Sequence, residues 1–166
     1  MTRSTLSQMS LVIVVTMVLL LSARGDAAAQ QSSPRFGTWK WNAAKSTPSP
    51  FSPKSLMRTD EPSGDGVKVT YDGIDADGSR IAYFYTARYD GQEYRPTGVG
   101  MGNGWETISL KRIDDYSYEG TLKRGGEVVS RVKVVISKDG KTMTQTVEVR
   151  NPAGQPIHSI SVWDKQ

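Results

Sequence analysis

The chain has 166 residues, no cysteine, one histidine and a formal net charge of +4 at pH 7. Its basic residues are scattered, each usually near an acid, whereas a nucleic-acid-binding protein concentrates them on one stripe. We therefore expect no nucleic-acid partner, and the lack of thiols and of a second histidine argues against a metal site and against covalent catalysis.

The first residues have the pattern of a secretory signal peptide. Arg3 supplies a basic start, residues 11–21 are apolar apart from Thr16, and three alanines at 27–29 offer a cleavage site. A membrane-spanning helix needs roughly 20 apolar residues, so this run is too short for one. We expect residues 1–29 to be removed, no stable membrane anchor to remain after cleavage, and the protein to be periplasmic or secreted.

Removal of residues 1–29 leaves 137 residues with a formal charge of +3, because Arg3, Arg24 and Asp26 leave with the leader. This length suits one domain. We expect residues 30–35 to be a disordered N-terminus and residues 36–166 to form a single all-β domain. Without disulfides in an oxidising compartment, its stability must come from packing and sheet closure.

From residue 36 onward, apolar and polar residues alternate over short stretches, as in antiparallel strands with one buried face. Turns with glycine separate the stretches, at Asp65-Gly66, Asp77-Gly78, Asp90-Gly91, Gly125-Gly126, Asp139-Gly140 and Ala153-Gly154. Residues 43–53 could form one turn, but the prolines at 48, 50 and 53 favour an extended connection. The expected strands are 36–42, 55–61, 67–73, 80–88, 92–95, 105–112, 115–123, 127–137, 142–150 and 156–164.

The expected fold is an all-β antiparallel up-and-down meander of about ten strands. Such a sheet would expose two long edges, and closure into a barrel removes them. We therefore expect a barrel, with a two-sheet β-sandwich as the alternative.

The run Gly37-Thr38-Trp39 resembles the Gly-x-Trp signature that opens lipocalin and other calycin barrels. The longer run 37–46, with 89–91, 109–112 and 137–142, is similar to small secreted bacterial proteins of uncharacterised function. The resemblance implies a lipocalin-like barrel whose interior holds a small apolar ligand. It also implies that Trp39 closes the barrel floor under an arginine from the last strands, for which Arg150 is the candidate.

Two polar patterns have an ordinary structural interpretation. The acids around Asp75 lack the glycine and the bidentate acid that a calcium loop requires at its sixth and twelfth positions. The glycine-rich segment 98–104 leads into a strand and not into the helix that a phosphate-binding loop needs. We expect hairpin turns at the first and a flexible rim connection at the second.

Aromatic side chains and the single histidine are the candidate ligand-binding residues. Aromatic rings on strand faces are most often core, but in a hollow barrel they would line a pocket. His158 shares a strand face with Ile160 and Val162, which would direct it inward as a buried, hydrogen-bonded histidine or as a ligand contact. The predicted ligand-binding set is Tyr83, Tyr85, Trp105, Tyr116, Tyr118 and His158.

Three classes of function are compatible with these patterns. The first is an exported barrel whose lumen binds a largely apolar small molecule, and the second is an envelope or extracellular protein-interaction module. An enzyme is the third, but no convergent set of ionisable groups is recognisable. We expect the first class, with no catalytic residue, no cofactor and no metal; the sequence does not determine the oligomeric state.

Overall fold

Alternation of inward apolar and outward polar side chains produces strands, because successive residues of a strand point to opposite faces. The computed structural model describes residues 33–48, 52–150 and 155–166, and these contain ten strands in one sheet. The strands are β1 (Gly37–Trp41), β2 (Ser55–Ser63), β3 (Gly66–Ile74), β4 (Arg80–Arg88), β5 (Thr97–Val99), β6 (Thr107–Arg112), β7 (Ser117–Arg124), β8 (Glu127–Ile136), β9 (Thr142–Arg150) and β10 (Pro156–Lys165).

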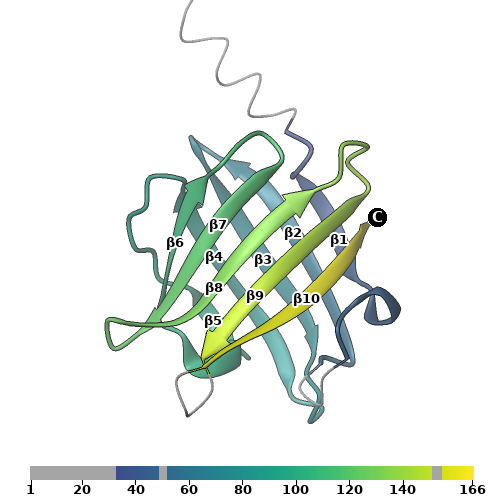
Figure 1. Ribbon diagram of the computed structural model, residues 1–166, viewed down its shortest axis with the longest axis vertical. Coiled ribbons are helices and arrows are strands. Elements are labelled where there is room, and N and C mark those ends of the chain that lie inside the picture. Colours follow the sequence, from purple (N-terminus) through teal and green to yellow (C-terminus); the bar gives the residue numbers. More distant parts are fainter. Residues whose placement is uncertain (1–32, 49–51, 151–154) are drawn as a thin grey trace, which may run out of the picture. The chain divides into compact units, whose positions relative to one another are not determined.

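The sheet order is β5-β4-β3-β2-β1-β10-β9-β8-β7-β6, and every neighbouring pair is antiparallel. The first strand therefore pairs with the last, through Trp39 opposite Lys165 and Trp41 opposite Trp163. Figure 1 shows strands of the second half of the chain lying across those of the first half. This confirms the all-β, up-and-down prediction: one sheet curls into a half-barrel, with its core on the concave face.

The two edges of the sheet, β5 and β6, are consecutive in sequence and are joined only sparsely. Two isolated bridges connect the segment that precedes β5 to β6. They pair Asp90 with Lys111 and Tyr94 with Ile108. The prediction of a strand at 92–95 is therefore wrong, and the edge strand β5 begins at Thr97 instead. Proline at position 96 explains the shift, because it has no N–H to donate to a ladder.

The first hairpin turn uses a different glycine from the one expected. Gly64, with φ of +58°, takes the left-handed conformation, while Gly66 is already the first residue of β3. A Cβ at Gly66 would collide with the carbonyl oxygen of Ala87 on β4. Gly66 is thus required by the close approach of two strands and not by the turn.

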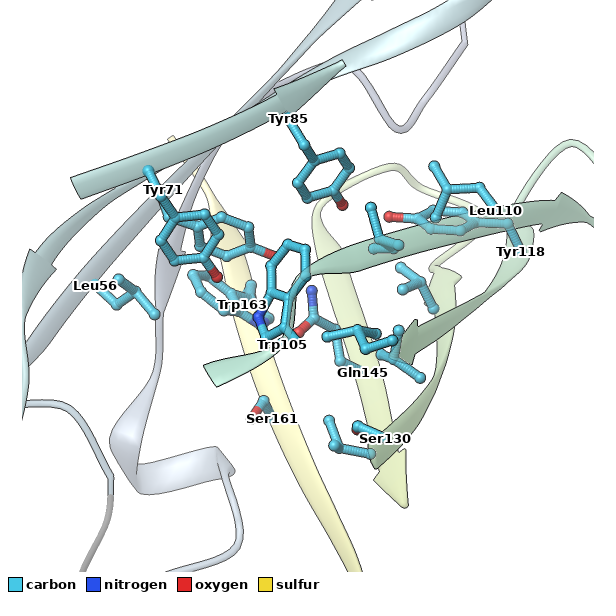
Figure 2. Close-up of a pocket in the computed structure, with 16 residues that line it drawn as sticks. Leu56, Tyr71, Tyr85, Trp105, Leu110, Tyr118, Ser130, Gln145, Ser161 and Trp163 are labelled. Carbon is cyan, nitrogen blue, oxygen red and sulfur yellow. The ribbon is translucent and has the colours of Figure 1, made fainter. Parts of the chain in front are cut away.

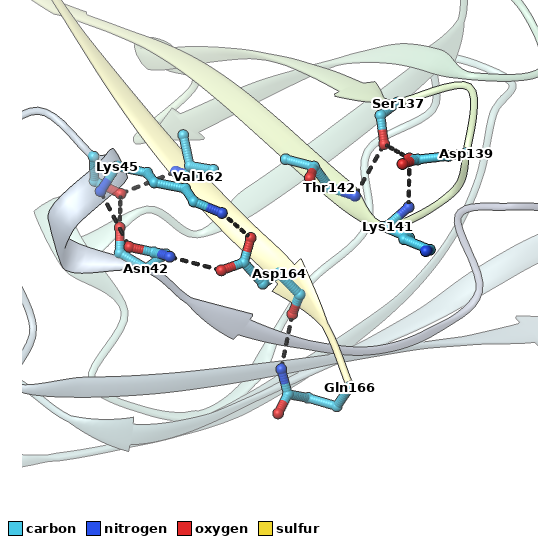
Figure 3. A network of polar contacts seen from close by, with 10 residues as sticks. Asn42, Lys45, Ser137, Asp139, Lys141, Thr142, Val162, Asp164 and Gln166 are labelled. Atoms are coloured by element: carbon cyan, nitrogen blue, oxygen red, sulfur yellow. Dashed lines mark hydrogen bonds and ion pairs between the residues drawn. The ribbon is translucent and has the colours of Figure 1, made fainter.

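The junction of β1 with β10 is held from outside by a short turn. Residues Ala43–Lys45 form one 3-10 turn capped by Asn42, within the connection that was expected to be extended. The Asn42 amide and the Lys45 ammonium both donate to the carboxylate of Asp164, at 2.6 and 2.8 Å. Figure 3 shows this network beside the Ser137–Asp139 turn. The first and last strands are therefore joined by side chains as well as by the ladder.

Residues Pro34–Gln166 form one compact unit. The predicted leader, 1–29, lies outside the described residues, as do residues 30–32 of the segment expected to be disordered. Arg35, from the end of that segment, is ordered and only 2% exposed. Among the described residues, no helix is long and apolar enough to cross a membrane.

Candidate functional site: an aromatic cavity beside a buried ion pair

Inward-facing side chains divide into two groups, and five strands (β2, β3, β4, β8 and β9) contribute to both. We call the first group the packed end; it comprises Trp39, Arg58, Asp60, Val67, Val69, Ala87, Ile136 and Met143, all buried. The second group, the cavity end, lines a cavity of about 220 Å³ and follows on the same strands. On β3, for example, Val67 and Val69 belong to the packed end and Tyr71 to the cavity end.

Trp39 lies at the centre of the packed end and is fully buried. Its indole N–H donates to the carbonyl oxygen of Arg35 at 3.1 Å, and the Lys165 ammonium lies 5.0 Å from its ring centroid. The cation over this tryptophan thus comes from the last strand but is a lysine. Arg150, the residue the resemblance suggested, is paired with Pro156 at the opposite end of β9 from Met143.

Beside Trp39, β2 directs a charged pair into the interior. Arg58 and Asp60 are 1% and 2% exposed, and the Arg58 Nε and Nη2 donate to the two carboxylate oxygens at 2.6 and 2.7 Å. Burial lowers the pKa of Arg58, but the Asp60 carboxylate and the neighbouring tyrosines together raise it by more, so that this pKa lies well above its usual value. Burial also raises the pKa of Asp60, against the effect of Arg58. The short bidentate contact is that of two ionised groups.

Two tyrosines connect this ion pair to the cavity. Arg58 Nη1 donates to the Tyr71 hydroxyl at 3.1 Å, and Nη2 donates to the Tyr118 hydroxyl at 2.5 Å. Both tyrosines also line the cavity. Burial is the largest reason why the pKa of Tyr118 lies far above its usual value, so the phenol stays neutral and keeps its proton. Hydrogen bonds to the two hydroxyls therefore link the Arg58–Asp60 ion pair to the cavity wall.

The cavity wall is largely aromatic. Tyr71 and Tyr83 stack with ring centroids 4.7 Å apart, and Trp105 meets the edges of Tyr83 and Tyr85 at 5.8 and 6.1 Å. Trp163 contacts Tyr71 edge-on at 6.1 Å. Figure 2 shows the labelled aromatic side chains converging on one space, with the hydroxyl ends of Tyr85 and Tyr118 directed towards each other. Large rings that meet at their edges leave space between them, and this explains why the cavity end is not filled.

A few polar groups complete the wall. Ser130, Gln145 and Ser161 are among the lining residues, and Ser130 donates to the carbonyl oxygen of Glu148 at 3.1 Å. The indole N–H of Trp163 is buried and has no hydrogen-bond partner among the described residues. No acid, base or histidine is among the described residues that line the cavity.

The structure brings four of the six predicted site residues together. Tyr83, Tyr85, Trp105 and Tyr118 all line the cavity. Burial holds the pKa of Tyr83 and of Tyr85 well above the usual value of about 10. These four rings thus lie in one interior wall, and whether they bind a ligand stays a prediction.

The other two predicted residues lie elsewhere. Tyr116 precedes β7 and is half-buried, with the Lys138 ammonium 3.8 Å from its ring centroid. His158 is exposed and lines a groove on the outer face with Glu148 and Arg131. Its predicted inward orientation is wrong, because the register that buries Trp163 opposite Met143 turns Ile160 and His158 outward.

Sequence reasoning missed several residues of the site: Arg58, Asp60, Tyr71, Gln145, Ser161 and Trp163. Arg58 and Asp60 share one strand face with Leu56, which was a usable signal, but an alternation that ends in charges indicates a solvent-facing strand. Trp163 shares a face with Ser161, and that face looked more polar than the one with Ile160 and Val162. Only the pairing of strands across the sheet shows that the face of β2 with Arg58 and the face of β10 with Trp163 are both directed inward.

Comparison of the chain with known protein families and with curated proteins finds no match. Within the described ranges, no group of three or more histidine, cysteine, aspartate or glutamate side chains is arranged to hold a metal ion. The class defined by the structure is thus an all-β half-barrel with an aromatic interior cavity.

Proposed function

We propose that this protein is an exported carrier or sensor that binds a small, largely apolar molecule in the aromatic cavity. The observation that carries this proposal is the cavity itself, about 220 Å³ in volume and lined by aromatic and aliphatic side chains with a few polar groups. Small-molecule sites have this composition, because apolar walls supply affinity and a few polar groups orient the ligand.

The volume limits the size of the ligand. A dry apolar cavity of roughly 150 Å³ takes up benzene, and pockets for drug-sized ligands begin at about 300 Å³. A cavity of about 220 Å³ lies between these values. A single-ring compound or a short branched chain is therefore the expected occupant, and a long acyl chain is not.

The direction of the aromatic side chains supports ligand binding over a protein-interaction module. An interaction surface needs a contiguous exposed apolar patch, whereas Trp105, Tyr85 and Tyr118 are at most 5% exposed. The exposed large apolar residues are distributed over several elements: Phe84, Val99, Ile113, Val128, Val135, Ile157 and Ile160. The lack of carboxylate, histidine, lysine and arginine side chains among the described lining residues supports binding over catalysis.

Export is proposed from the leader alone. The basic start, the short apolar run and the three alanines at 27–29 support cleavage and release to the periplasm or medium. N-terminal sequencing of protein recovered from those fractions should begin near Gln30. Recovery of protein that begins at Met1 would contradict export with cleavage.

Native mass spectrometry of protein purified from its own host, followed by titration with small aromatic compounds, tests the binding function. Val147 lines the cavity, so Val147→Phe should fill the space and weaken binding at least tenfold. Val135→Phe on the outer face of β8, where Val135 is 40% exposed, is the matched control and should bind like wild type. No co-purifying molecule and no saturable binding in wild type would overturn the proposal.

A further inference from the structure

The hydroxyls of Tyr71 and Tyr118 have a fixed hydrogen-bond polarity. A guanidinium has only donors, so each hydroxyl oxygen must accept from Arg58, at 3.1 and 2.5 Å. The proton of each hydroxyl is therefore left to donate to another group. No described residue accepts either proton, and both side chains line the cavity.

A third donor lies in the same wall. The Trp163 indole N–H can only donate, it is buried in a side chain that is 2% exposed, and no described residue accepts from it. The Trp163 ring contacts the Tyr71 ring, with centroids 6.1 Å apart. A buried donor without a partner costs free energy unless a ligand or water satisfies it. The wall thus contains three donors that have no acceptor among the described residues.

The charge of the wall decides what kind of acceptor fits. The nearest cation, Arg58, is already bound by both oxygens of Asp60, and none of the described lining residues is charged. A carboxylate ligand would lose its hydration without gaining an unpaired cation. A neutral acceptor oxygen loses much less on burial. The hydrogen bonds from Arg58 also polarise the two phenols and strengthen them as donors.

We propose that the cavity recognises a neutral carbonyl-type oxygen, as in a ketone, aldehyde, ester or amide, carried on a small apolar body. The oxygen accepts from the Tyr71 and Tyr118 hydroxyls or from the Trp163 indole, while the aromatic rings contact the apolar body. This inference rests on the proposed binding function and specifies its ligand class. Cations are the opposing possibility, because the faces of aromatic rings attract them.

Four probes with one ring and similar size separate these chemistries. Acetophenone carries the carbonyl oxygen, and α-methylstyrene replaces that oxygen by a methylene group. Benzoate and benzylammonium carry an anion and a cation. Dissociation constants from NMR titration of the full mature chain should be about three- to tenfold lower for acetophenone than for α-methylstyrene, the range for one hydrogen bond. Both ions should bind more weakly than acetophenone.

Removal of one donor tests the assignment to residues. In Tyr71→Phe and, separately, Tyr118→Phe, the preference for acetophenone over α-methylstyrene should shrink, while α-methylstyrene itself should bind as in wild type. Tyr116→Phe is the matched control, because Tyr116 does not line the cavity, and it should keep the full preference. If a variant fails to fold, the wild-type comparison of the four probes still decides.

The outcomes distinguish this inference from the function on which it rests. Equal, saturable binding of acetophenone and α-methylstyrene would overturn the carbonyl inference and leave the apolar-ligand function standing. Tightest binding of benzoate or of benzylammonium would show that the ligand class is wrong. No saturable binding of any probe would overturn both.

Discussion

The packed end and the cavity end of the interior share strands β2, β3, β4, β8 and β9, yet they differ in packing and in the polar groups that they bury. At the packed end, the Trp39 indole and the Asp60 carboxylate each have their partners, Arg35 and Arg58. At the cavity end, the Trp163 indole has none among the described residues. The comparison indicates that the packed end supplies stability, and that the cavity end keeps unsatisfied donors and empty space that a ligand can use.

The largest expected effect is at Trp39. Replacement of a fully buried tryptophan by alanine should lower the free energy of unfolding by about 3–5 kcal/mol, a large share of the stability of a small domain. Chemical denaturation of Trp39→Ala measures it. Lys40→Ala, at the neighbouring exposed position, is the control and should change little. A midpoint of Trp39→Ala near wild type would show that the packed end is not the stabilising region.

The buried ion pair gives the next prediction. Asp60→Ala leaves the Arg58 charge without its partner and should cost about 3–5 kcal/mol, because an uncompensated buried charge is strongly unfavourable. The double variant Arg58→Met/Asp60→Leu removes both charges and should recover most of this loss. Urea denaturation of both proteins makes the comparison. A double variant as unstable as the single one would mean that packing, and not charge compensation, decides this region.

Matched enlargements sharpen the contrast between filled and empty space. Val69 at the packed end is fully buried, so Val69→Phe should cost roughly 1–3 kcal/mol through overpacking. In Val147→Phe the added ring enters the existing cavity, and the change should stay within about 1 kcal/mol of wild type. Thermal and chemical denaturation of the two variants measure the difference. Equal losses would argue that no cavity exists at Val147.

The smallest expected effect is on how stability depends on pH. Asp139 and Asp60 should change the stability in opposite directions as the pH is lowered. Hydrogen bonds from the Ser137 hydroxyl and from the Lys141 backbone N–H lower the pKa of Asp139 in the hairpin turn. An acid with a lowered folded-state pKa stabilises the protein above its unfolded-state pKa, and this contribution is lost as the pH falls. Burial raises the pKa of Asp60, so its ionisation opposes folding as the pH rises through that value.

Because several turn acids have lowered pKa values, against the raised pKa of Asp60, the turn acids should dominate. The melting temperature of wild type should fall as the pH is lowered below about 4. In Asp139→Asn this fall should be shallower than in wild type, because the carboxylate with the lowered pKa is gone. A melting temperature that rises on acidification would mean that Asp60 outweighs the turns.

Local sequence determined most of the strands and their up-and-down order. Alternation with glycine turns placed 80–88 and 142–150 with the bounds that the structure has, because hairpin neighbours are set by short-range residue patterns. The same patterns placed three of the cavity rings on inward faces, since Tyr83, Tyr85 and Tyr118 alternate with outward residues within their own strands.

Only the tertiary structure decided the rest. β10 has apolar residues on both faces, so its orientation depends on pairing with β9, where Trp163 meets Met143. Asp60 and Arg58 face inward because the curled sheet brings Tyr118, 60 residues away in sequence from Arg58, onto the same guanidinium. The cavity is likewise a property of side chains that meet from opposite strands. Strand alternation is a local property, but register, closure and empty volume depend on contacts between residues far apart in sequence, and no single segment contains that information.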